Sequence, residues 1–302
     1  MAKRAVLGIF LCALLATAWL LLRTSPQLPA GLGGAIVFVS DRDGIPALYW
    51  RRLPRDKARR LTFGSEPASD PTVSPDGTRV AFAMNGRVAV VAVATAEVRV
   101  LTLGVDWKDA QPAWLADGRR LVVSARRRTG EPAGLHLLDP TPDGPLARSP
   151  LTQPRASDDT SPAPTPDGSA IVFAREERLM RVELADGRVR RLTGGFKRDR
   201  APRFLPSGRI LCAWSEGKRH GIDALDPDGR TRETIAEGGR FYRALAPSPD
   251  GRFLLATLLY DMGFHPFAGL FGRQRDELHL LDSHGQELAL LEPAAHSADW
   301  TR

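Results

Sequence analysis

The chain has 302 residues, of which 43% are apolar and 25% are charged, so it can bury a sizeable core and is not a disordered chain. The formal net charge is +7, and it falls by three to +4 without the first thirty residues, which hold three basic and no acidic residues. Acidic residues alternate with the basic ones along the remaining chain. This charge pattern gives no reason to expect a nucleic-acid partner.

The N-terminus carries an export or anchoring segment. Two basic residues precede an uncharged, largely apolar run from Ala5 to Leu22. Its length lies between the apolar core of a signal peptide and the shortest stretch that spans a bilayer, so cleavage and anchoring both remain open. The basic residues before the run place the rest of the chain on the outer side of the membrane, in the periplasm or an equivalent extracytoplasmic space. We assign residues 1–30 to this segment and residues 31–302 to the folded domain.

A repeat of about 45 residues runs through the folded domain, and a period of that length is typical of propeller blades. Its core reads Pro-x-apolar-Ser-Pro-Asp-Gly followed by an apolar strand. The clearest copies are Pro71 to Phe82 (PTVSPDGTRVAF) and Pro162 to Phe173 (PAPTPDGSAIVF), and weaker copies begin at Pro112, Pro202 and Leu245. Asp-Gly provides the positive φ of a tight hairpin, so each repeat is predicted to form a small four-stranded antiparallel sheet.

One position in the first strand of each repeat gives the number of blades. It falls at Val73, Trp114, Pro164, Phe204, Pro247 and Trp300, with spacings of 41, 50, 40, 43 and 53 residues. Ala35 to Ser40 reads as a second strand without a first, and Ala298 to Trp300 reads as a first strand with nothing after it. Joining the two ends gives an all-β, six-bladed propeller and removes the exposed sheet edges.

The motif at Pro71 to Phe82 resembles the repeat of TolB-type propellers, and Phe38 to Tyr49 (FVSDRDGIPALY) resembles the Ser-Asp-Arg-x-Gly hairpin of the same family. The resemblance covers residues 34 to 302 and implies the fold. It implies less about function, because such propellers occur as binding proteins, as parts of peptidases and as polysaccharide lyases. The Gly-x-Ser-x-Gly motif of the associated peptidases is absent from this sequence, which argues against serine peptidase chemistry.

Three aspartates lie three residues before the motif proline, at Asp109, Asp159 and Asp199. In a propeller, the loops leading into the first strands open on the same face as the loops joining second and third strands. We therefore expect these aspartates near the mouth of the central channel on that face. They form either an acidic ring that holds a cation or a basic peptide, or separate caps for their own loops.

The loops joining second and third strands hold further candidates. The loop at residues 261–275 is enlarged and rich in phenylalanine, so it folds back as a lid or presents an apolar patch to a partner or a membrane. Arginines lie in the equivalent loops of other blades. The candidate partner-binding residues in these loops are Phe264, Phe267, Phe271, Arg127 and Arg219.

The sequence shows no metal-ligand spacing, glycine-rich phosphate loop or catalytic cysteine motif, so we expect no cofactor. Cys212 reads as a buried side chain on a strand. The favoured interpretation is a monomeric, membrane-associated, non-catalytic propeller that engages an envelope protein or peptide through its loops. The alternative is a carbohydrate-active, lyase-like enzyme with its site at the channel mouth, where His265 and His296 are the candidate histidine pair because lyases of this fold use His and a metal in the channel.

Overall fold

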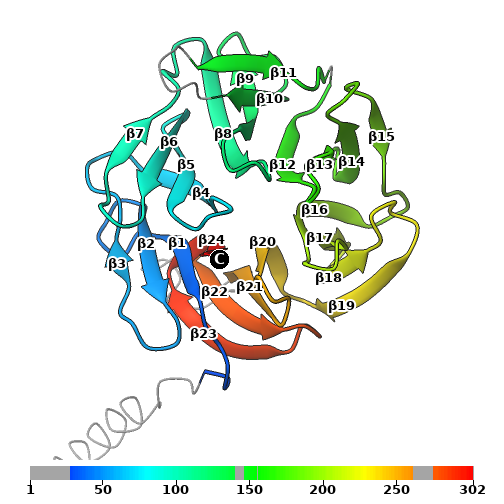
Figure 1. Ribbon diagram of the computed structural model, residues 1–302. Helices are drawn as coiled ribbons and strands as arrows, with labels where there is room; N and C mark the ends of the chain where they lie inside the picture. The colour runs from blue at the N-terminus through cyan, green and yellow to red at the C-terminus, as the bar shows by residue number, and fades with distance from the viewer. Residues whose placement is uncertain (1–27, 140–145, 155, 261–274, 302) are drawn as a thin grey trace, which may run out of the picture. The chain divides into compact units, whose positions relative to one another are not determined.

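The computed structural model describes residues 28–139, 146–154, 156–260 and 275–301. The chain divides into two compact units, Met1–Leu32 and Gly33–Arg302. In the second unit, six four-stranded antiparallel sheets stand around a central axis as the blades of a propeller (Figure 1). The predicted fold class is confirmed. Over the residues that are described, we find no helix with the length and apolarity needed to cross a membrane, and the N-terminal apolar run lies outside them.

Each blade runs from an innermost to an outermost strand, and we number the blades I to VI in chain order. Blade I is β24-β1-β2-β3, and blades II to VI take the following strands in successive groups of four. The strand bounds are β1 Ala35–Ser40, β2 Ala47–Arg52, β3 Arg59–Arg60, β4 Ala68–Val73, β5 Arg79–Met84, β6 Arg87–Ala92, β7 Val98–Val100, β8 Trp107–Trp114, β9 Leu121–Arg127, β10 Gly134–Asp139, β11 Ala147–Pro150, β12 Asp159–Pro164, β13 Ala170–Arg175, β14 Arg178–Glu183, β15 Val189–Arg191, β16 Arg198–Phe204, β17 Ile210–Glu216, β18 Arg219–Leu225, β19 Arg232–Gly238, β20 Phe241–Pro247, β21 Phe253–Tyr260, β22 Arg275–Asp282, β23 Glu287–Pro293 and β24 Ala295–Thr301.

The two ends of the propeller meet in blade I, as the repeat count predicts. The C-terminal strand β24 pairs antiparallel with β1, and Ile36 stands opposite Trp300 in the register. The Trp300 side chain is buried, and its indole Nε1 donates a hydrogen bond of 2.8 Å to the carbonyl oxygen of Ala246 in blade VI. Trp300 therefore connects blade I to blade VI, and strand β24 completes the sheet of blade I.

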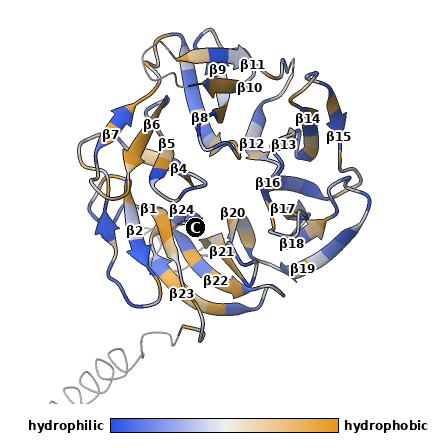
Figure 2. Cartoon of the chain, viewed as in Figure 1, coloured by the Kyte–Doolittle hydropathy of each residue, from blue (hydrophilic) through white to orange (hydrophobic). Residues whose placement is uncertain are grey.

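The hydrophobic core lies between blades, because alternate residues of a strand point to opposite faces of its sheet. In β5, Val80 and Phe82 pack towards blade I, whereas Ala81 packs towards blade III. In β13, Phe173 packs towards blade III and Val172 towards blade V. Second strands such as β1 are consequently hydrophobic along most of their length, and the outermost β15 is largely hydrophilic (Figure 2).

The Asp-Gly hairpins connect the first and second strands of the blades. In blade II, the Ser74 hydroxyl and the Thr78 amide both donate to the Asp76 carboxylate, and these bonds lower the pKa of Asp76 to about 2. Gly77 completes the turn with φ +72°. Blades IV and VI repeat the arrangement at Thr165, Asp167 and Gly168 and at Ser248, Asp250 and Gly251.

A recurring Leu-Thr pair follows the fourth strand of the first four blades. Its threonine hydroxyl accepts a hydrogen bond from the backbone N–H of a third-strand residue in the same blade, at 2.8 to 3.0 Å. The short outer strand is thus extended by one side-chain hydrogen bond. The threonines are Thr62, Thr102, Thr152 and Thr193.

Candidate functional site

The strand register shows which loops share a face. In blade III, Trp107 at the start of the first strand pairs with Arg127 at the end of the second. In blade V, Arg198 likewise pairs with Ser215, close to the turn that leads to Arg219. The loops that lead into first strands and those that join second and third strands therefore open on one face, which we call the loop face.

The three predicted aspartates lie at the beginning of first strands, and all three side chains are fully buried. In blade III, both carboxylate oxygens of Asp109 accept hydrogen bonds from Nη2 of Arg148, at 2.9 and 2.8 Å. Arg148 belongs to the outermost strand, so this ion pair crosses the whole blade. An aspartate held in this way is already neutralised inside its own blade.

Blades IV and V hold their aspartates with different partners. Asp159 accepts from Nε and Nη2 of Arg175 at 2.6 and 2.8 Å, and also from the Thr152 hydroxyl of the preceding blade. Asp199 accepts from Nη2 of Arg232 at 2.8 Å. Each arginine holds the carboxylate of its own blade. The partner-binding role predicted for the aspartates stays a prediction, and their contacts give them a structural role.

Blade V contains a second buried carboxylate that sequence reasoning missed. The side chain of Asp223 is fully buried and contacts Nζ of Lys197 at 2.9 Å and Nη1 of Arg232 at 3.0 Å. Arg232 therefore joins Asp223 to Asp199 in one network. Cys212 lies beside it, buried and free as expected, and burial raises the pKa of its thiol well above the ordinary value.

The two predicted arginines are both on the loop face, in different surroundings. Arg219 is exposed and pairs with Glu237 across the outer strands of blade V. Arg127 lies over Trp107, with its guanidinium carbon 4.9 Å from the ring centre, and it borders a cavity in blade III. The phenylalanines Phe264, Phe267 and Phe271 lie outside the described residues.

Strongly exposed apolar side chains lie on the same face, on connectors between different blades, and these residues were not predicted. Among the described residues, the four most exposed large apolar side chains are 69 to 88% accessible, and each lies on a connector leading into a first strand. The four residues lie on three connectors, and each connector follows a Leu-Thr pair, so an apolar residue one to three positions after that pair was the available signal. The four residues are Phe63, Leu103, Val105 and Phe196.

An axial cavity of about 270 Å³ is lined by residues from all six first strands. Each first strand carries a β-bulge near its middle. In five of them a bulge residue adopts a left-handed conformation, with φ between 48° and 53°. Those residues are Asp70, Gln111, Ser161, Ala201 and Ser297. The bulges turn polar groups and two arginines, Arg203 and Arg243, towards the axis.

A metal centre is not formed by the described part of the chain, where no three His, Cys, Asp or Glu side chains come together as ligands. His279 is buried in β22 between two glutamates, with Nδ1 2.8 Å from Glu287 and Nε2 3.1 Å from Glu277. His265 lies outside the described residues. On the loop face, the described residues provide ion pairs and exposed apolar side chains.

No protein-family model matches the chain. The chain is 31% identical over 143 residues to the "Protein TolB homolog" of Chlorobium luteolum, a match that covers 47% of this chain and 31% of the relative. The crystal structure of TolB from Acinetobacter baumannii superposes with a TM-score of 0.71, at 16% identity, over 89% of this chain and 66% of that one. The fold is a TolB-type propeller.

Solved structures with a similar fold include an enzyme. An oligogalacturonate lyase in complex with manganese superposes with a TM-score of 0.60, at 16% identity, over 84% of this chain and 73% of that one. The matched segment spans about a third of the length of the curated relative. The TolB-type assignment therefore describes the propeller, and the activity is a separate question.

Proposed function

We propose that this chain is a non-catalytic, extracytoplasmic binding propeller that engages an envelope protein or peptide through its loop face. The observation that carries the proposal is the placement of Phe63, Leu103, Val105 and Phe196, which are strongly exposed and all lie on that face. Exposed apolar side chains on one face are typical of a protein contact surface. The likeness to TolB supports a role in the cell envelope.

The loop face also carries an arginine that stacks on an aromatic ring. Arg127 stacks on Trp107, which follows the connector that holds Leu103 and Val105. Aromatic and arginine side chains are enriched among the residues that contribute most to binding energy. Strand β21 ends and β22 begins on the loop face, and the segment between them, which contains Phe264, Phe267 and Phe271, lies outside the described residues. We include it in the proposed contact surface.

A capture experiment tests the proposal. The full chain, solubilised in mild detergent, is compared with the triple variant Phe63→Ser, Leu103→Ser and Phe196→Ser in pull-downs from a solubilised envelope. The matched control is Val100→Ser with Leu290→Ser, which changes the partly exposed apolar residues of two outermost strands. A specific partner captured by the wild type and the control, but lost with the triple variant, supports the proposal. Equal capture by all three proteins contradicts it.

The lyase-like alternative is separated by a second measurement on the same protein. Cleavage of acidic polysaccharide is followed by the absorbance of the unsaturated product, with and without added divalent cation. Activity that survives the triple variant would favour the enzyme over the binding propeller.

Protection of the propeller from protease in intact cells, and its cleavage after the outer barrier is opened, tests the extracytoplasmic location.

A further inference from the structure

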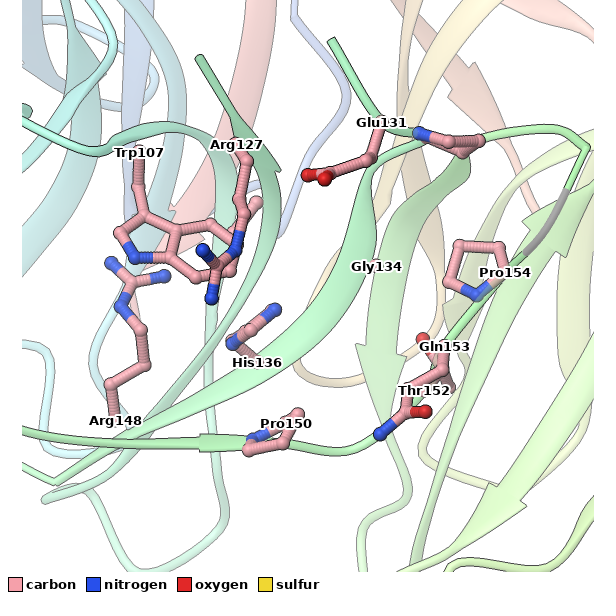
Figure 3. A pocket seen from close by; sticks show the side chains of 12 residues that line it. Trp107, Arg127, Glu131, Gly134, His136, Arg148, Pro150, Thr152, Gln153 and Pro154 are labelled. Atoms are coloured by element: carbon pink, nitrogen blue, oxygen red, sulfur yellow. The ribbon is translucent and has the colours of Figure 1, made fainter. Parts of the chain in front are cut away.

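A second cavity, separate from the axial one, opens within blade III at the loop face. Its volume is about 360 Å³, and all four strands of the blade contribute to its wall. The strand residues that matter most are Trp107, Arg127, His136 and Arg148, on β8, β9, β10 and β11. Figure 3 shows their side chains on one side of the cavity, opposite the Thr152 to Pro154 connector.

The backbone around this cavity is held in place by close contacts. A Cβ atom added to Gly134 would lie 2.8 Å from the carbonyl oxygen of Thr152 and 3.1 Å from Cδ of Pro154, so only glycine allows the connector to approach β10. Pro132 and Pro150 add further rigid wall. The cavity is therefore built into the blade and does not need a ligand to form it.

Two buried nitrogen atoms at the cavity lack a partner in the part of the chain that is described. They are Nη1 of Arg148 and Nδ1 of His136. The other terminal nitrogen of Arg148, Nη2, already holds Asp109. A buried donor without an acceptor is destabilising by about 1 to 3 kcal/mol, so native proteins seldom retain one without a reason. Both residues line the cavity, so a small shift of either side chain would bring its buried nitrogen within reach of an acceptor there.

The cavity also has opposite charges on its two sides. Arg127 stacks on Trp107 and has no carboxylate within ion-pair distance among the residues described. Glu131 accepts a hydrogen bond from the Thr129 hydroxyl at 3.0 Å, and the described structure places no basic group within ion-pair distance of it. In Figure 3 its carboxylate turns towards the side where Arg127 lies. Trp107 gives the cavity an apolar wall, and so do the three prolines Pro132, Pro150 and Pro154.

We propose that this cavity binds an apolar zwitterion, which is an α-amino acid or a short peptide with an apolar side chain. Its carboxylate accepts from Arg127 and from Nη1 of Arg148, its ammonium group meets Glu131, and its apolar part packs on Trp107 and the prolines. The volume lies at the lower end of the range for small-molecule sites, which suits a ligand of this size. This inference does not depend on the proposed function.

Calorimetric titration of the full chain with four probes tests the charge requirement. The probes are L-phenylalanine, glycyl-L-phenylalanine, 3-phenylpropionate and 2-phenylethylamine, which share a phenyl group and differ in charge. We expect one of the two zwitterions to bind at least about tenfold more tightly than either singly charged probe, because each singly charged probe lacks one of the two charged contacts. Preference for the amino acid or for the dipeptide identifies the natural class. No binding by either zwitterion, or equal binding of all four, overturns the proposal.

Two single variants locate the charges, and both change exposed side chains that the fold does not need. Arg127→Gln should weaken the zwitterion and 3-phenylpropionate by about tenfold and leave 2-phenylethylamine unchanged. Glu131→Gln should weaken the zwitterion and the amine and leave the acid unchanged. The matched control is Arg219→Gln, at the corresponding turn of blade V. Binding that is unaffected by both cavity variants, or lowered equally by the control, overturns the site.

Discussion

Arg148 reaches from the outermost strand of blade III to Asp109 on its innermost strand, and one nitrogen of the guanidinium group binds both carboxylate oxygens. The Asp109 side chain is fully buried, whereas that of Arg148 is 18% exposed. The ion pair thus connects the first and fourth strands of the blade, which are not neighbours in the sheet. The same arginine also borders the blade III cavity.

Removing one member of this pair should destabilise the protein much more than removing a surface pair. Arg148→Met leaves a buried carboxylate without its partner, and we expect a loss of about 3 kcal/mol in the free energy of unfolding. Arg219→Met, which breaks an exposed pair with Glu237, should leave the free energy of unfolding almost unchanged, because water screens the pair. Urea denaturation followed by circular dichroism measures both. Similar losses in the two variants would show that Asp109 is better solvated than its burial implies.

Acid should destabilise the protein through His136. Burial, followed by the charge of Arg148, lowers the pKa of His136 from 6.5 to about 4. Between these two values the unfolded chain binds a proton that the folded chain does not, so stability present above pH 6.5 is lost as the pH falls towards 4. The full effect is roughly 3 kcal/mol.

The variant His136→Gln isolates that effect, because the other histidines remain. Its free energy of unfolding should fall less than that of the wild type between about pH 7.5 and about pH 4.5, with the difference set by the missing proton. Urea midpoints at several pH values give the two curves. Parallel curves would mean that His136 is protonated as easily in the folded protein as in the unfolded one.

The Asp-Gly hairpins should be sensitive to a single methyl group. Gly168 has φ +70°, and an added Cβ would be 3.7 Å from that of Ala116, so space is not limiting. Gly168→Ala should therefore cost about 1 to 2 kcal/mol through backbone conformation alone. Gly238→Ala is the control, since that glycine has neither a left-handed φ nor a nearby atom. An equal effect of both changes in thermal unfolding would contradict this explanation.

The closure of the ring should depend on Trp300. Its side chain is 4% exposed and donates a hydrogen bond to Ala246 of the neighbouring blade. Trp300→Ala should cost about 3 to 5 kcal/mol and, by loosening β24, expose the edge of β1. Denaturant unfolding together with light scattering measures both consequences. Leu103→Ala, at an 84% exposed position, should change neither; loss of stability there would instead mark a hidden contact.

Much of the propeller could be predicted because its signals are local and repeated. The Asp-Gly turns and the apolar strands after them predicted the four-stranded antiparallel sheets, and the incomplete repeats at the two ends predicted the pairing of β1 with β24. Turn chemistry and strand alternation act over a few neighbouring residues, so they can be read directly from the order of the amino acids.

The partners of the aspartates could not be predicted, for a physical reason. Asp109 and Asp199 are held from the fourth strand and Asp159 from the second, so position in the repeat does not decide the partner. Which arginine arrives depends on side-chain length and packing across each blade. Arg127 was a candidate from its loop position, yet only the fold places it on Trp107 beside Glu131 and Gly134.

The sequence by itself determined the fold class, the number of blades, the way the ring closes and the sharing of one face by two sets of loops. The tertiary structure decided which charges are buried in pairs, which apolar residues stay exposed on that face, and where a cavity is left. Repeats encode contacts between neighbours in the chain. Ion pairs and cavities arise between residues tens of positions apart, where small differences between blades decide which side chains come into contact.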